Sequence, residues 1–147
     1  MTFLQAIPSI VPQPDYKIIK GGSDQKGVGN FYNAVTNMYV APGYPPEVVI
    51  GGKIVIPDHV QPYAATVTAL IQWSGGIGPK VNARIMLGST AIVTGPESNS
   101  GNVAYASVDR IITPGETYSL FWRGEGSFFS YPSCIAGADT SLEIYPI

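Results

Sequence analysis

Apolar and polar residues alternate with a period of two along much of the chain, most clearly in residues 63–73. One face of this segment carries Tyr63, Ala65, Val67, Ala69, Ile71 and Trp73, and the other carries Ala64, Thr66, Thr68, Leu70 and Gln72. Successive side chains of a β-strand point to opposite faces. The pattern therefore predicts a strand with one apolar, buried face and one mixed face.

Short segments of the same character follow one another, separated by loops rich in Gly, Pro, Ser and Asn. The other predicted strands are residues 15–20, 31–40, 47–57, 80–87, 90–94, 103–113, 117–123, 128–131 and 140–147. Gly51-Gly52 predicts a bulge or bend within 47–57, and Gly88-Ser89 predicts a hairpin between 80–87 and 90–94. No segment combines helical periodicity with capping residues.

This spacing of short strands predicts an all-β protein, either a sandwich, a jelly roll or a barrel. The chain of 147 residues suits one domain. Pro8, Pro12 and Pro14 prevent a helix and favour extended backbone at the start. We therefore expect an extended N-terminal arm over residues 1–14 and a single domain over residues 15–147.

The composition restricts the classes of partner. Charged residues make up only 12% of the chain, the net charge is −2 and no Lys/Arg cluster is present, so nucleic-acid binding is not expected. No apolar run is long enough to span a bilayer, and membrane insertion is not expected either. The N-terminus lacks the basic region of a signal peptide. With Cys134 as the single cysteine, an internal disulfide cannot form, which fits synthesis in a reducing cytosol.

The residue types that carry chemistry are sparse. His59 is the single histidine, no serine stands in a nucleophile-elbow motif, and one His with one Cys cannot complete a zinc site. The Gly-rich segments 27–30 and 75–80 lack the Lys-[Ser/Thr] and following helix of a phosphate loop. We therefore expect no catalytic residues, no metal and no cofactor, and we interpret Cys134 as a small buried thiol.

Aromatic residues are concentrated in residues 119–133, SLFWRGEGSFFSYPS. Strand alternation assigns Tyr118, Leu120 and Trp122 to the core and leaves other large apolar groups on second faces. Because apolar residues left exposed in a cluster favour association, we predict a subunit interface. Its residues would be Phe121, Phe129, Tyr145 and Ile147. The alternatives are that another strand or the arm covers this face, or that the aromatics form a carbohydrate platform.

Four segments in the second half, taken in order, resemble a known fold. They are YAATVTALIQW, the Arg-bearing NARIML, PGETYSLFWRGEG after a Gly-acid turn, and the terminal TSLEIYPI. Over residues 60–147 the chain resembles the jelly-roll heads of the tumour necrosis factor and complement globular-head type, in the form found on bacteriophage virions. It also resembles small actinobacteriophage-type minor tail proteins. The resemblance implies an antiparallel jelly-roll β-sandwich that forms homotrimers with the terminal strand near the three-fold axis.

The resemblance and the composition lead to a first functional hypothesis: a non-enzymatic structural protein of a tailed-phage virion. It would be made in the host cytoplasm, would bind itself and other virion proteins, and would act as a homotrimeric minor tail component that contacts the host. A host cell-surface glycan is a further candidate partner. The candidate recognition loop, polar and Gly-rich, contains Glu97, Ser98, Asn99 and Ser100.

Two alternatives remain open from the sequence. The first is a capsid decoration protein that docks on the shell through arm residues Phe3, Leu4, Ile7 and Ile10. The second is a carbohydrate-binding module or a small glycan hydrolase.

Overall fold

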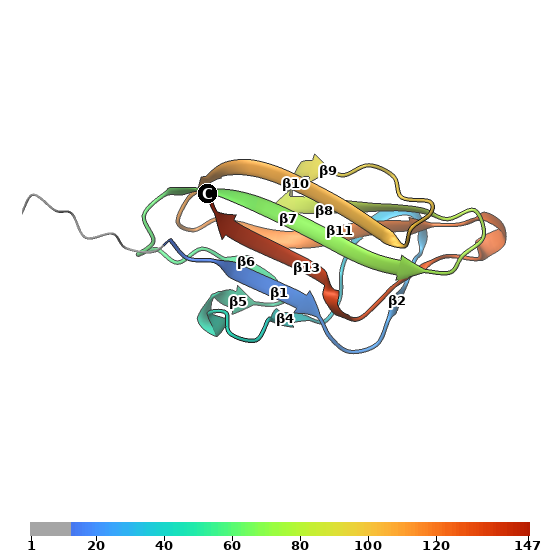
Figure 1. Ribbon diagram of the computed structural model, residues 1–147, viewed down its shortest axis with the longest axis horizontal. Helices are drawn as coiled ribbons and strands as arrows, with labels where there is room; N and C mark the ends of the chain where they lie inside the picture. The colour runs from blue at the N-terminus through green and yellow to red at the C-terminus, as the bar shows by residue number, and fades with distance from the viewer. Residues whose placement is uncertain (1–12) are drawn as a thin grey trace, which may run out of the picture.

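Two antiparallel β-sheets packed face to face form the protein (Figure 1), in a computed structural model that describes residues 13–147. The larger sheet contains β1 (Tyr16–Lys20), β2 (Gln25–Lys26), β4 (Met38–Val40), β7 (Tyr63–Ser74), β10 (Val103–Ile112), β12 (Ser133–Cys134) and β13 (Gly137–Pro146). The smaller sheet contains β3 (Gly29–Ala34), β5 (Val49–Ile50), β6 (Lys53–Val55), β8 (Lys80–Leu87), β9 (Thr90–Thr94) and β11 (Thr117–Glu125). The arm residues Phe3, Leu4, Ile7 and Ile10 lie outside the described residues.

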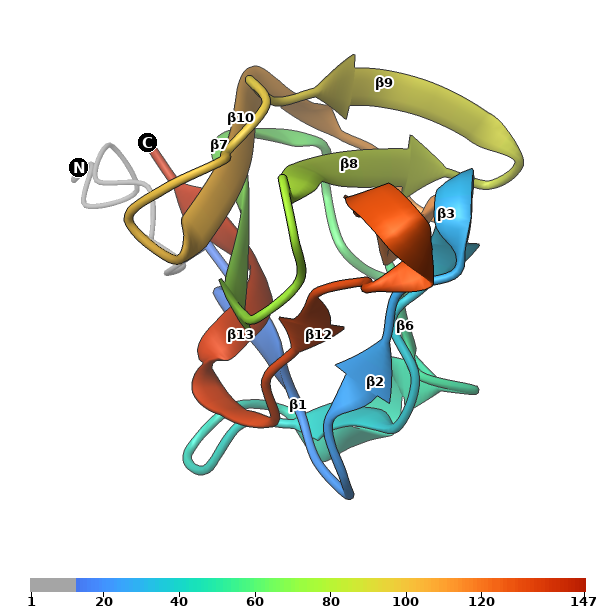
Figure 2. The ribbon, with the colours of Figure 1, turned by 90° about the vertical axis from the view of Figure 1, so that its right-hand side faces the viewer.

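The long strands alternate between the two sheets as the chain proceeds. Strand β7 belongs to the larger sheet, β8 and β9 to the smaller one, β10 to the larger, β11 to the smaller and β13 to the larger. The larger sheet places β10, β7, β13, β1 and β4 side by side, and the smaller one places β9, β8, β11 and β6 side by side, with β3 also paired to β11. Figure 2 shows the two layers end-on.

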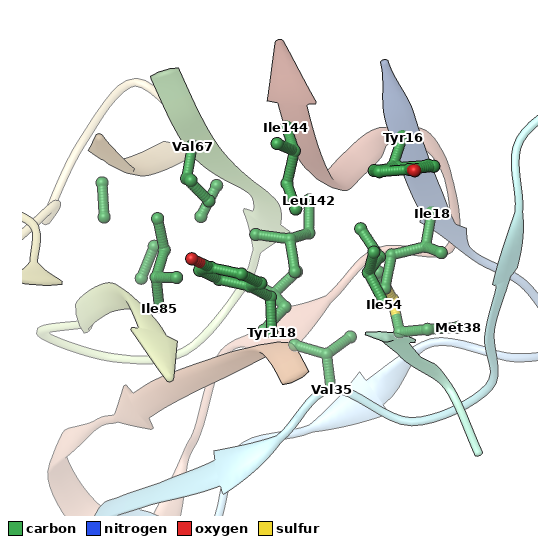
Figure 3. Close-up of a cluster of buried hydrophobic side chains, with 14 of the residues drawn as sticks. Tyr16, Ile18, Val35, Met38, Ile54, Val67, Ile85, Tyr118, Leu142 and Ile144 are labelled. Carbon is green, nitrogen blue, oxygen red and sulfur yellow. The ribbon is translucent and has the colours of Figure 1, made fainter. Parts of the chain in front are cut away.

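The core lies between the sheets and is formed by alternate residues of each strand. In β7 the apolar face predicted from the sequence is buried along its whole length. Tyr118, Leu120 and Trp122 of β11 are buried from the smaller sheet, and Leu142 and Ile144 of β13 from the larger. Figure 3 shows Tyr118, Val67, Leu142 and Ile144 among the side chains that meet between the layers. Period-two patterning is therefore sufficient to assign the inward faces of the long strands.

Most of the predicted strands are observed, but one prediction is wrong. Residues 128–131 do not form a strand: Ser127–Phe129 form a short 3-10 turn, η3, and pairing resumes only at β12. Both Phe128 and Phe129 have positive φ angles, 55° and 58°, which an extended strand does not allow. The two phenylalanines therefore do not point to opposite faces of a sheet.

Two other predicted segments are interrupted. The segment 31–40 divides into β3 and β4 around Asn37, whose φ of 57° breaks the extended backbone. Within 47–57, the 3-10 turn η2 (Pro46–Val48) precedes β5, and β5 and β6 form a hairpin across Gly51-Gly52. Both glycines have positive φ, 61° and 75°, as a two-residue type I′ turn requires. This feature is a tight hairpin turn rather than the bulge or bend that we expected.

Helical structure in residues 13–147 is limited to 3-10 turns, and none of it is long and apolar enough to cross a membrane.

Leu142 provides a test of the core. Its side chain is completely buried between the sheets, so Leu142→Ala removes apolar contacts and leaves a cavity. We expect a loss of about 2–5 kcal/mol in the free energy of unfolding, measured by urea denaturation. Thr90→Ala, at an exposed position of β9, serves as the control and should stay within about 0.5 kcal/mol of the parent. A similar loss in both variants would contradict this assignment of the core.

Candidate functional site

The outward face of β10, β7 and β13 combines continuous strand pairing with several exposed apolar side chains. Antiparallel pairing aligns the outward residues of the three strands in rows. From one end to the other, the rows are Val103–Gln72; Tyr105–Leu70–Ser141; Ser107–Thr68–Glu143; Asp109–Thr66–Tyr145; and Ile111–Ala64, with Ile147 beside Ala64. We call this set of rows the outward β10–β7–β13 face.

The apolar side chains of this face are exposed in large part. The exposed fractions are 53% for Tyr105, 55% for Ile111, 57% for Tyr145 and 69% for Ile147. They lie toward both ends of the face, while the middle rows carry small hydroxyl side chains. Thr66 Oγ1 donates to Asp109 Oδ1 at 2.7 Å, and the hydroxyls of Thr68 and Ser107 are 3.4 Å apart.

The outward positions of these three strands include no Lys or Arg. Long cationic side chains commonly protect an exposed sheet from association, because their aliphatic stems cover apolar surface while their charged groups stay in water. Without them, contiguous tyrosine, isoleucine and threonine side chains form a surface with the composition of a protein–protein interface, in which aromatic residues are enriched and charged residues depleted.

The structure separates the four residues predicted to form a subunit interface. Tyr145 and Ile147 lie on the outward β10–β7–β13 face. Phe121 belongs to β11 of the smaller sheet, where it alternates with buried Leu120 and Trp122 and so faces away from the core on the opposite side of the sandwich. Phe129 lies in η3, in a turn that joins neither sheet. The four therefore do not form one patch.

Residues of β10 were absent from the predicted interface, although the sequence carried the relevant signal. In residues 103–113 every second residue from Val103 to Ile111 is exposed, while Ala104 and Ala106 are buried. The small alanines mark the inward face, and the larger apolar residues are therefore on the outward one. Applying the period-two argument to this strand would have identified Tyr105 and Ile111.

A pair of carboxyl groups lies at the border of this face, where β1 meets β13. Burial raises the pKa of Asp15 to about 7, and a hydrogen bond to Glu143 and the charge of Glu143 add to this effect, while Lys17 opposes it. Asp15 Oδ1 is buried and accepts no hydrogen bond from the described residues. Tyr44 donates its hydroxyl to Glu143 Oε2 at 3.4 Å. The arrangement favours the protonated form of Asp15.

The candidate recognition loop is fixed to the body of the domain at its first two residues. Glu97 forms an ion pair with Arg123, 2.9 Å from Oε1 to Nη2. Ser98 exchanges backbone hydrogen bonds of 2.7 and 2.9 Å with Val81, and its Oγ accepts a 3.0 Å hydrogen bond from Trp73 Nε1. The next two residues, Asn99 and Ser100, are exposed, and Ser100 O accepts a 3.2 Å hydrogen bond from Ser98 Oγ. The role of the loop in recognition remains a prediction.

The residues considered for catalysis are far from a catalytic arrangement. His59 is exposed and lines a groove of about 510 Å³ with Tyr16, Glu47 and Val60. Cys134 is completely buried, and burial raises its thiol pKa to about 12, so it is not available as a thiolate. Across residues 13–147, no group of three or more His, Cys, Asp or Glu side chains is placed to hold a metal ion.

The Asp15–Glu143 pair generates a pH-dependent prediction. The folded pKa of about 7 exceeds the ordinary value of about 4 for an unfolded chain, so the folded state binds the proton more tightly. The stability contributed by protonation is therefore present at about pH 4 and is lost as the pH rises through about 7. We expect Asp15→Asn to raise the melting temperature at about pH 8 and to flatten its decline between about pH 5 and 8.

The control for this prediction is Asp139→Asn, at an exposed position of β13. It should leave the pH dependence of the melting temperature as in the parent. Equal pH slopes in the parent and in Asp15→Asn would contradict the elevated pKa of Asp15.

No model of a known protein family matches the sequence, and no characterised protein is detectably related to it in sequence. Solved structures do match. Eiger TNF from S. frugiperda superposes with a TM-score of 0.62 over 93% of this chain and 94% of the other, at 10% sequence identity. The globular domain of zebrafish complement 1qA protein matches with a TM-score of 0.42 over 91% of this chain and 97% of the other, at 8% identity. At such low identity the likeness to Eiger TNF concerns the fold alone, and it confirms that residues 13–147 form an antiparallel jelly-roll β-sandwich.

Proposed function

We propose that this protein is a non-enzymatic structural protein that assembles as a homotrimer through its outward β10–β7–β13 face. The observation that carries the proposal is the set of exposed tyrosine and isoleucine side chains on that face, whose three strands carry no outward Lys or Arg. A monomer with this surface would be prone to uncontrolled association. Closed rotational symmetry uses the same surface on every copy and stops the association at a defined size.

Three copies suit the position of the terminal strand. Tyr145 of β13 and Ile147, which follows that strand, are among the most exposed apolar residues of the face. The resemblance seen in the sequence implies a trimer with this strand near the three-fold axis, and burial at the axis would remove both side chains from water. The predicted interface residue Phe121 lies on the other sheet and is outside this proposed contact.

We further propose that the trimer is a component of a tailed-phage virion, a minor tail protein that contacts the host. The low charge and high Gly and Pro content support this assignment, as does the division of the domain into two ends. Pro14 and Ile147 both bond to the start of β7 at one end. Residues 75–79, 97–102 and 126–132 lie at the other end (Figure 1). Anchoring near the termini would leave the second end free for recognition.

Capsid decoration is the second candidate. The described chain starts at the end that carries Ile147, so an arm preceding Gln13 begins at that same end. This position suits docking of the whole domain onto a shell through the arm. The domain and the proposed trimer contact are the same in both candidates.

Light scattering tests the trimer. Because Tyr105 and Ile111 would be buried between copies, Tyr105→Glu or Ile111→Glu places a carboxylate in the contact and should raise the dissociation constant by on the order of 100-fold. Phe31→Glu, at a comparably exposed position of β3 in the smaller sheet, should retain the trimeric mass. A monomeric parent at micromolar concentration, or trimers in all three variants, would overturn the proposal.

The virion assignment is tested by a three-dimensional map of the particle, compared with that of particles that lack the gene for this protein. We expect three-fold density of the size of three jelly-roll domains on the tail. Density on the head would support capsid decoration instead. Particles that are indistinguishable with and without the protein would contradict both.

A further inference from the structure

The turn at η3 has an unusual sequence for its backbone geometry. Ser130 N donates to the carbonyl oxygen of Ser127 at 2.9 Å, closing a four-residue turn. Its two central residues, Phe128 and Phe129, both have positive φ. This is the type I′ pattern, in which Asn, Asp and Gly are strongly preferred because larger side chains are strained there. We call the segment from Ser127 to Ser130 the Phe-Phe tip.

Both phenylalanines are exposed almost completely. The exposed fractions are 87% for Phe128 and 88% for Phe129, the highest of any large apolar residue described. Strained backbone opposes folding stability, and phenyl rings that stay in water gain nothing from burial to offset that cost. A feature that costs stability without contributing to the core is expected where it serves binding rather than the fold.

The tip is held rigidly. Ser127 N donates to the carbonyl oxygen of Ile77 at 2.6 Å, and Ile77 N donates to that of Ser130 at 3.0 Å, so residues 75–79 brace the turn. A side chain on Gly126 would collide with Ser130 O, which restricts this approach to glycine. The ring of Phe129 also meets that of Tyr131 edge-on, with centroids 6.5 Å apart.

The segments that hold the tip carry further exposed apolar and cationic residues. Ile77, whose backbone bonds to the tip, and Val28 are each about half exposed, and Gly27 N next to Val28 donates to Pro132 O at 2.9 Å. In the backbone pairing of the strands, Lys80 is opposite Glu125 just before the tip, and Lys26 is opposite Ser133 just after it.

The charges next to the tip balance in number, with Lys26, Lys80 and Arg123 against Asp24, Glu97 and Glu125, but the two lysines differ from Arg123 and the two glutamates in their pairing. Both lysines are exposed, and neither takes part in an ion pair with any residue of 13–147. The nearby carboxylates of Glu125 and Glu97 are both paired with Arg123. Asp24 is engaged through its Oδ1, which accepts from Ala136 N at 2.8 Å. The two lysines therefore remain available to an anionic partner.

We propose that the Phe-Phe tip inserts into the interfacial layer of an anionic lipid membrane. Phe128 and Phe129 would enter the boundary between headgroups and acyl chains, and Lys26 and Lys80 would remain at the level of the phosphates. Aromatic residues favour this depth, and exposed lysines are attracted to anionic headgroups. The rings of Phe128 and Phe129 carry no hydrogen-bonding group of their own, which suits the apolar side of a lipid interface better than a sugar.

From the sequence we expected no membrane insertion, because it contains no apolar run that could span a bilayer. Shallow insertion of a turn requires only a few apolar residues at the apex, and a search for spanning segments does not detect it. The inference does not require the homotrimer. A trimer would present three tips on one side, and simultaneous engagement would strengthen binding without any new contact.

The decisive variant is Phe128→Asn with Phe129→Gly, because these residues suit the turn better than the native ones. Binding is measured by flotation with vesicles of phosphatidylglycerol and phosphatidylcholine in equal amounts. We expect the variant to melt at the same temperature as the parent or higher, and to lose vesicle affinity by on the order of 100-fold. Ile50→Ser, which removes an exposed apolar residue from β5, should bind as the parent does.

Two further measurements identify the groups involved. Lys26→Gln with Lys80→Gln should weaken binding to the anionic vesicles and leave the weaker binding to pure phosphatidylcholine vesicles unchanged. Phe129→Trp should show a blue-shifted emission on addition of anionic vesicles, and Ile50→Trp should not.

Absence of vesicle binding by the parent, or equal binding by the Asn-Gly variant, would overturn the proposal. If the parent ignores vesicles but the Asn-Gly variant loses adsorption to host cells, the tip binds a protein or glycan instead, and the lipid proposal is wrong. The mass of the same samples by light scattering reports separately on the trimer, so failure of one proposal is distinguishable from failure of the other.

Discussion

The pairing of β7 along both of its edges is the constraint on which the rest of the structure depends. Strand β10 pairs with it from Val103 to Ile112 on one side, and β13 and β12 occupy the other. One face of β7 supplies a continuous apolar row to the core, while the other forms the middle of the outward β10–β7–β13 face. Because the backbone groups on both edges of β7 are paired within the sheet, another molecule cannot associate with β7 by adding a strand to it. It can contact β7 only through the outward side chains of that strand.

The two ends of the sandwich differ in how they are built. At one end Pro14, Tyr63 and Ile147 are tied together by hydrogen bonds that involve backbone atoms, so the start and finish of the domain are close. At the other end residues 75–79 and 126–132 brace each other, and Arg123 bonds to Asn82, Asn30, Glu97 and Glu125. That network fixes the loop bearing Glu97 against β8 and β11. Rigid loops on a rigid sandwich lose little conformational entropy on binding, which suits recognition.

The sequence was sufficient for the faces of the long strands but not for the assignment of strands to sheets. Alternation in 63–73, 117–123 and 140–147 identified the buried residues correctly because each of these strands has one face toward the core and one face away from it. It does not reveal which sheet a strand joins, and Phe121 and Tyr145 were grouped although β11 and β13 belong to opposite layers. Residues 128–131 were misassigned for another reason: adjacent phenylalanines favour a strand by propensity, and the positive φ values that place them in a turn depend on bracing by residues distant in sequence.

The burial of Cys134 has a consequence for experiment. It is the single cysteine of the chain, its side chain is completely enclosed by the core, and its thiol remains protonated at neutral pH. A cysteine introduced on the surface is then the one reactive thiol in each copy, with no need to alter the native residue. A spin label or fluorophore can thus be attached at a chosen position of the outward face or of a loop, while the core keeps its native residues. In a symmetric assembly such labels report identical distances between copies, a direct geometric measure of how the subunits are arranged.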